Sequence, residues 1–185
     1  MGKTFKKLFL PLFIIAIMVM SGIGYMAGEN SDEIIDYKGI RFSKVQSGWL
    51  TYSGDKQVIL FNNPNDLEGI DIVGVSLNEL NSAIKIYVSS NPEDNLGLYL
   101  KGFQFNILNN LKPMKVNACY EDNERCADLP LKDCSDASSN IKVILIKKGE
   151  SLVEYENNCL LIQGQDEELL KYIDKLVLEM LLNGN

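Results

Sequence analysis

The stretch IKIYVSSNPEDNLGLYLKGFQFNILNNLKPMKVNACY, residues 84–120, decides the fold. It starts with a β-branched run at 84–88 and returns to a second strand-like run at 114–120. Between the two runs, Asn91 can cap a helix and Pro92 suits the first helical position. Apolar residues then recur at helical intervals at Leu96, Leu100, Phe103, Ile107 and Leu111. Strand, helix and strand predict a right-handed βαβ unit with parallel strands.

The segments on either side predict the rest of an α+β domain. A strand is expected at 37–45, and an antiparallel hairpin is expected from 48–52 and 57–61 across a Gly-containing turn. Val75, Ser76 and Glu79 fit a staple and capping box that start a short helix.

After the βαβ unit, residues 141–146 and 152–162 are expected to pair as a second hairpin, with a bend at Asn157-Asn158. The chain should end in a helix capped by Asp166. Its apolar stripe consists of Leu169, Leu170, Ile173, Leu176, Val177, Met180 and Leu181. These elements define one α+β domain at 37–185, after an acidic spacer at 29–36.

The N-terminal part, residues 1–28, predicts a cytoplasmic stub and a transmembrane anchor. Residues 8–28 contain no charge, and about twenty helical residues cover the hydrocarbon core of a bilayer. Lysines precede this stretch and carboxylates follow it, so the N-terminus should be cytoplasmic and the domain extracytoplasmic. The protein is therefore expected in the cell membrane as a single-pass protein. The apolar side chains expected to contact the bilayer are Leu8, Phe9, Leu12, Phe13, Ile14, Ile15, Ile17, Val19 and Ile23.

A cleaved signal peptide is the alternative interpretation of the same segment. Ser21, Gly22, Gly24 and Ala27 are small residues of the kind that precede a cleavage site. Against cleavage, the apolar run is longer than a usual signal core, and Tyr25-Met26 disturbs the site at Ala27. We expect the anchor to be retained.

The charge of the domain argues against nucleic acid as a partner. The whole chain carries a net charge of −7, and all 25 acidic residues but only 15 basic ones follow Gly28, a balance of −10. Such a surface is repelled by phosphate backbones. The chain has no histidine, which removes Ser-His-Asp and Cys-His nucleophiles and His-ligated zinc. No phosphate-binding glycine motif is present, and we expect no cofactor and no metal.

Four cysteines, Cys119, Cys126, Cys134 and Cys159, lie on the predicted outer side. An even number of cysteines in an oxidising compartment predicts two disulfides. Three pairings can be formed, and we favour Cys119 with Cys126 and Cys134 with Cys159. Zinc is the rival interpretation, but the spacings contain no CxxC.

From residue 84 onward, the element order resembles the thioredoxin fold, with KVILIKKGESLVEY (142–155) and DEELLKYIDKLV (166–177) similar to that family's terminal hairpin and helix. The resemblance implies the fold without the redox activity, because residues 90–93 read SNPE where that family has CxxC. The anchor, YKGIRF (37–42) and NNCLLIQG (157–164) also resemble uncharacterised membrane-anchored extracytoplasmic proteins of small-genome archaea. That resemblance implies no activity.

These observations predict a binding or envelope interaction module without catalysis. An envelope protein is the expected partner, besides the lipid bilayer that residues 8–28 contact. The alternative is a thiol-disulfide exchange enzyme that uses Cys119, Cys126 or Cys134. A third interpretation is an acid/base enzyme built from carboxylates such as Asp122, Glu124 and Asp128.

Overall fold

The computed structural model describes Ile17, residues 33–72 and residues 77–183. Ile34–Asn185 form one compact unit. In the part of the chain described here, no helix is both long and apolar enough to cross a membrane. The predicted anchor at 8–28 lies outside the described residues except for Ile17.

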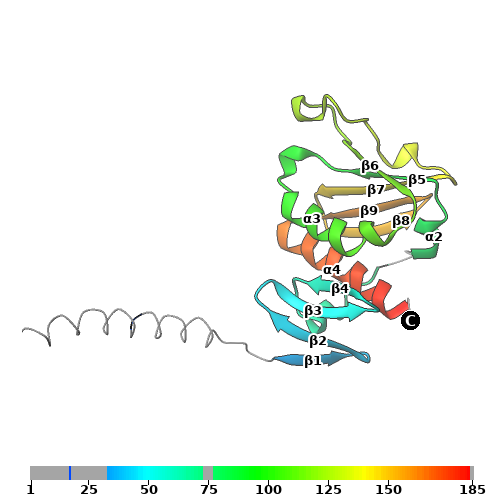
Figure 1. Ribbon diagram of the computed structural model, residues 1–185. Helices are drawn as coiled ribbons and strands as arrows, with labels where there is room; N and C mark the ends of the chain where they lie inside the picture. The colour runs from blue at the N-terminus through cyan, green and yellow to red at the C-terminus, as the bar shows by residue number, and fades with distance from the viewer. Residues whose placement is uncertain (1–16, 18–32, 73–76, 184–185) are drawn as a thin grey trace, which may run out of the picture. The chain divides into compact units, whose positions relative to one another are not determined.

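The unit contains two sheets with helices between them (Figure 1). The first sheet consists of β1 (Ile34–Tyr37), β2 (Ile40–Val45), β3 (Gly48–Ser53) and β4 (Lys56–Leu60). The second consists of β5 (Lys85–Ser89), β6 (Met114–Ala118), β7 (Ile141–Lys148), β8 (Leu152–Glu156) and β9 (Cys159–Gly164). The α-helices are α2 (Leu77–Asn81), α3 (Gly97–Asn106) and α4 (Asp166–Asn183). Short 3-10 helices are η1 (Pro64–Leu67), η2 (Pro92–Asp94), η3 (Leu108–Asn110), η4 (Glu124–Cys126) and η5 (Cys134–Asp136).

The first sheet is an antiparallel meander in the order β1-β2-β3-β4. The predicted hairpin of β3 and β4 is confirmed, with Trp49 opposite Leu60 and both side chains buried. Gly48 has a φ of +138°, and a Cβ there would lie 2.1 Å from the carbonyl oxygen of Leu60. Only glycine fits at this position. Strand β1 starts at Ile34, so it includes the end of the stretch predicted as an acidic spacer. The single strand predicted at 37–45 is wrong, because Lys38 and Gly39 have positive φ angles and form the turn between β1 and β2.

The second sheet has the order β6-β5-β7-β9-β8. Strands β6, β5, β7 and β9 are parallel, and β8 is antiparallel to β9. The predicted βαβ unit is therefore confirmed, because β5 and β6 are parallel neighbours joined through α3.

The prediction that residues 141–146 and 152–162 pair as a second hairpin is wrong. Residues 141–146 belong to β7, which pairs in parallel with β9 and not with the strand that follows it in the chain. The hairpin forms between β8 and β9, where Asn157 and Asn158 have φ values of 49° and 68°. Two successive positive φ angles are those of a tight two-residue hairpin turn. The thioredoxin resemblance depended on the hairpin that is not formed, so it gains no support.

The long helix predicted after Pro92 is also divided. It forms η2, α3 and η3, because Asn95 adopts the left-handed conformation with a φ of 56° and interrupts the helical turn. Asn91 caps η2 as predicted, since its Oδ1 accepts a hydrogen bond from the backbone N–H of Glu93 at 3.0 Å. Four of the five predicted apolar positions are buried, and Leu100 is half-buried. The capping residues predicted at 75 and 76 lie outside the described residues.

The main core lies between the two sheets. Side chains from both sheets, α3 and α4 form one hydrophobic cluster. Helix α4 ends before Gly184 as predicted, but Asp166, expected as its cap, is its first helical residue and Gln165 precedes the first turn. Most of the expected apolar stripe is confirmed, with these residues buried in the cluster: Leu169, Ile173, Leu176, Val177 and Leu181. The helices thus cover one face of the second sheet (Figure 1).

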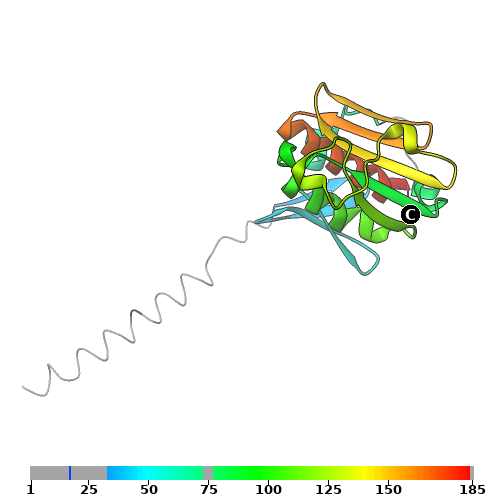
Figure 2. The same cartoon turned by 90° about the horizontal axis from the view of Figure 1, so that it is seen from above.

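The other face of the second sheet has a different cover. Val143, Leu145 and Cys159 form a smaller cluster there, together with Tyr120, Cys134 and other side chains of residues 119–140. This connection between β6 and β7 contains only two short 3-10 helices, and it lies over the sheet in the view from above (Figure 2). We call residues 119–140 the covering segment.

Two polar contacts fix the first sheet to the helices. Asp174 of α4 is fully buried, and one of its carboxylate oxygens accepts hydrogen bonds from the backbone N–H and the side-chain amide of Asn62, both at 2.7 Å. Asn106 of α3 donates to the carbonyl of Ile59 at 2.7 Å and accepts from its N–H at 3.2 Å. Burial raises the pKa of the Asp174 carboxyl from its ordinary 3.8 to about 6, and the hydrogen bonds from Asn62 act in the opposite direction.

We predict that the free energy of unfolding of the wild type falls as the pH rises from 4 to 7, and that Asp174→Asn removes this fall. The folded Asp174 carboxyl has a pKa of about 6 against an ordinary 3.8, so it holds its proton after the unfolded chain has lost it. The free energy of unfolding should therefore fall as the pH rises, by up to about 3 kcal/mol from this group. Urea unfolding at each pH measures it. Glu167→Gln, an exposed change on the same helix, controls for net charge; parallel curves for wild type and Asp174→Asn would contradict the prediction.

Candidate interaction site

The candidate site lies at the carboxyl ends of the parallel strands. Strands β6 and β7 flank β5 on opposite sides, so the connections after β5 and β6 lead in opposite directions. Open sheets of this type bind ligands beyond the carboxyl ends of their strands, most often at the switch point, which in this sheet lies between β5 and β7. Here, residues 90–95 follow β5 and the covering segment follows β6.

Both favoured cysteine pairings are formed. Cys119 bonds to Cys126 with a Cα–Cα distance of 6.1 Å, and Cys134 bonds to Cys159 at 5.2 Å. The first bond closes a short loop directly after β6. The second attaches the covering segment to β9. All four cysteines are therefore in disulfides, one that closes a loop within the covering segment and one that bonds this segment to the sheet.

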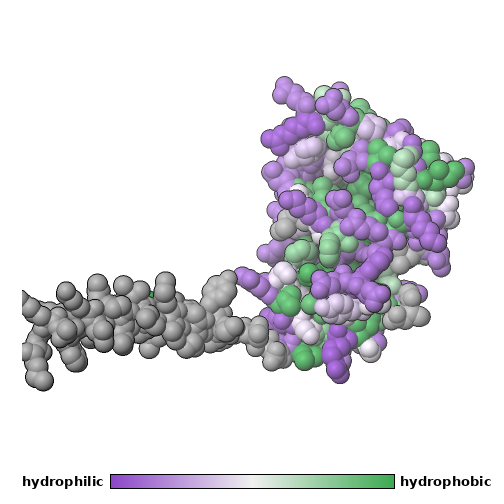
Figure 3. Space-filling view, in the orientation of Figure 1, coloured by the Kyte–Doolittle hydropathy of each residue, from purple (hydrophilic) through white to green (hydrophobic). Residues whose placement is uncertain are grey.

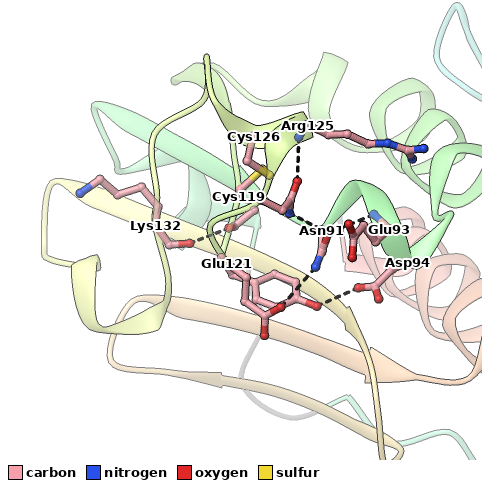
Figure 4. Close-up of a disulfide and its surroundings, with 11 residues drawn as sticks. Asn91, Glu93, Asp94, Cys119, Glu121, Arg125, Cys126 and Lys132 are labelled. Carbon is pink, nitrogen blue, oxygen red and sulfur yellow. Dashed lines mark hydrogen bonds between the residues drawn. A yellow bond between two sulfur atoms is a disulfide. The ribbon is translucent and has the colours of Figure 1, made fainter.

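Asn91 connects the two carboxyl-end loops (Figure 4). Its side chain is buried, and its amide nitrogen donates to Glu121 at 3.2 Å. Its oxygen also accepts from the Asn123 amide at 3.1 Å. The disulfide loop is thus held against η2 by a side chain that the sequence analysis identified only as a helix cap.

Tyr120 forms a second link between the same loops. Its hydroxyl donates to Asp94 at 2.8 Å. Burial and then the neighbouring Asp94 raise the pKa of Tyr120 well above its ordinary value of 10.0. The hydroxyl therefore remains a donor at physiological pH. Because Tyr120 bonds to Asp94 and Asn91 bonds to Glu121 and Asn123, the main role of these side chains is to brace the loops.

The carboxylates considered for acid/base chemistry are not gathered in a cleft. Asp122, Glu124 and Asp128 are exposed on the disulfide loop and just after it. Within residues 33–72 and 77–183, no group of three His, Cys, Asp or Glu side chains is placed to hold a metal ion. The structure thus joins the cysteines in two pairs but does not gather these carboxylates.

Beside the braced loops is an open hollow of about 200 Å³. Its apolar wall includes Val88 of β5, Leu100 of α3 and Leu129 of the covering segment. Lys101 and Gln104 of α3 stand at its exposed rim. These residues could not be predicted as a site from the sequence, because nothing in their local pattern shows that α3 and residue 129 meet at one end of β6.

The hollow adjoins the outer edge of β6. The backbone of Met114 donates to Ile84 at 3.2 Å and that of Ala118 accepts from Ser90 at 3.1 Å, so these residues face β5. Since backbone groups alternate along a strand, Lys115 and Asn117 face away from β5. Among the described strands, β6 pairs with β5 alone. The N–H and C=O groups of Lys115 and Asn117 thus form an open sheet edge.

A second hollow, of about 400 Å³, lies beside the edge strand β4 and is lined by side chains of α4, but there Asn106 already pairs with the outward backbone groups of Ile59. On the face shown in Figure 3, hydrophilic side chains cover most of the surface and hydrophobic ones are visible in small patches between them. The hollow and the β6 edge together combine apolar surface with accessible backbone groups, which suits them to contact a polypeptide.

Comparisons of the chain with protein-family models, with curated proteins and with solved structures found no match.

We predict that the disulfide between Cys134 and Cys159 stabilises the domain more than the disulfide between Cys119 and Cys126. The pairs are separated by 25 and 7 residues in the chain, and a longer closed loop restricts the unfolded chain more. Replacing both cysteines of the longer loop with serine should cost about 3.5 kcal/mol, against about 2.5 kcal/mol for the shorter loop. Urea unfolding of the two double variants measures the difference, and each variant serves as the control for the other. A larger loss for the 119/126 variant would contradict the loop-entropy argument.

Proposed function

We propose that this chain is a single-pass membrane protein whose extracytoplasmic α+β domain binds another envelope protein and does not catalyse a reaction. The binding surface is the β6 edge with its hollow. The observation that carries the proposal is that an open strand edge lies beside an apolar hollow of about 200 Å³. Strand edges left open are sites where proteins recognise other polypeptide chains.

The location follows from charge and cysteine use. Lys3, Lys6 and Lys7 precede the uncharged stretch at 8–28, which favours a cytoplasmic N-terminus. Two disulfides in the domain suit an oxidising compartment outside the cytoplasm. The lipid bilayer is then the first partner, through residues 8–28, and the domain is held near the membrane surface where other envelope proteins reside.

The main alternative is thiol-disulfide exchange. One observation favours it, since Cys119 both lines the hollow and closes the short disulfide loop. Against it, Cys119 is fully buried, and exchange needs a thiolate or disulfide sulfur that a second thiol can reach.

The mass of the membrane-extracted protein, alkylated with and without prior reduction, tests location and chemistry together. We expect four added alkyl groups, one for each of the 4 cysteines, only after reduction, and an intact N-terminal segment. Alkylation of unreduced protein would contradict the outward-facing orientation. Loss of residues 1–28 would show that the segment is a cleaved signal peptide.

A photoreactive benzoylphenylalanine in place of Gln104 tests binding at the hollow in intact membranes of the producing cells. We expect a cross-linked product of discrete mass, because Gln104 is exposed at the rim. The matched control carries the same group in place of Glu154, which is exposed on β8 at the opposite edge of the sheet. Equal amounts of cross-linked product at both positions would refute the proposed binding role. Reduction of insulin with multiple turnovers by the unmodified protein would refute it too, because the protein would then be a thiol-disulfide exchange enzyme.

A further inference from the structure

The geometry points to an extended peptide segment of the partner protein as the ligand of this site. The segment adds to the second sheet as a strand beside β6 and inserts one apolar side chain into the hollow. This inference rests on the proposed binding function and specifies its partner.

The backbone of β6 requires an extended ligand. The outward groups of Lys115 and Asn117 are two residues apart on one edge, which matches the hydrogen-bonding repeat of an added strand. A helix has already used its own backbone groups and cannot pair with this edge. Recognition by strand addition takes its affinity from these main-chain bonds.

The covering segment already pairs with this edge. Cys119 is the next outward-facing residue after Asn117, and its N–H donates to Pro130 at 3.0 Å while its carbonyl accepts from Lys132 at 2.8 Å. This bridge between Cys119 and Leu131 is parallel. The β6 edge therefore already pairs with an extended stretch of chain just beyond its carboxyl end. Lys115 and Asn117 belong to the same edge, nearer the start of β6.

The hollow selects an apolar side chain of limited size. It has a volume of about 200 Å³, and a cavity of about 150 Å³ can hold benzene. One branched aliphatic or aromatic side chain therefore fits. Because Asn117 lines the hollow and also belongs to the open edge, a residue paired beside β6 can place its side chain there.

Charge indicates the residues that flank this apolar anchor. No carboxylate lines the hollow, and Lys101 is the charged residue at its rim. Lys115 on the same strand is exposed, although its Nζ also donates to the carbonyl of Leu111 at 2.5 Å. In a domain where acidic residues outnumber basic ones, this local excess of lysine favours an acidic residue next to the apolar anchor.

The opposite edge of the sheet lacks these properties. Strand β8 carries Glu154 and Glu156, both exposed. These carboxylates repel an acidic residue in a ligand, whereas Lys115 on β6 attracts one. The comparison makes β6 the docking edge and β8 the natural control surface.

The test uses the full chain in nanodiscs and phage-displayed random octapeptides as the probe. Selected peptides should share an apolar residue within an alternating pattern and an acidic neighbour. Asn117→Pro removes one outward N–H and restricts the strand, and Gln104→Trp fills the hollow from α3. Each should weaken peptide binding about tenfold or more. Leu152→Asp on β8 should change it less than twofold.

A retained melting transition and both disulfides establish that each variant is folded. Selected peptides that bind Asn117→Pro as tightly as wild type overturn the inference. If the full chain forms a dimer and Asn117→Pro dissociates it, the peptide inference is also overturned, because a second copy of the chain then occupies the β6 edge. If no peptide is selected but the Gln104 cross-link forms, the peptide inference fails and the binding function stands. If both are absent, both fail.

Discussion

The central strands of the second sheet have two faces that must both be shielded from water, and this constraint shapes the rest of the domain. Ile86, Ile144 and Leu160 are fully buried on one face, and Val143 and Leu145 are buried on the other. Parallel sheets normally obtain cover on both faces from crossover helices. Here α3 and α4 cover one face only. The other depends on the covering segment, which contains only two short 3-10 helices. One disulfide closes a loop within this segment, and the other bonds it to β9.

The helices between the sheets must also be held in a defined position, because contacts between apolar surfaces alone do not fix where a helix lies along a sheet. The buried contact of Asp174 with Asn62 and the contact of Asn106 with Ile59 provide that specificity. The second contact also satisfies backbone groups of β4, the last strand of the first sheet. A helix side chain thus occupies part of that edge, whereas the edge of β6 is occupied only at Cys119.

Much of the fold could be predicted from local patterns. The βαβ unit, the first hairpin, the terminal helix and both cysteine pairings are found as expected. The second hairpin was predicted wrongly because adjacent strands in the chain were assumed to pair. In fact, the charged, alternating β8 suits an edge, and the start of β9, CLLI, is apolar throughout and suits a place between neighbours. The signal for the correct turn was Asn157-Asn158, since asparagine tolerates positive φ better than most residues.

The sequence by itself determined the local elements, the acidic character of the domain and the cysteine framework, because periodicity, caps and charge act between near neighbours. It also predicts the membrane anchor at 8–28. Only the tertiary structure decided which strand lies beside which, where Asn91 and Tyr120 brace the disulfide loop, and that β6 is left with an open edge beside a hollow. These features depend on hydrogen bonds and packing between residues far apart in the chain, and a local pattern holds no information about which distant backbone will arrive next to it.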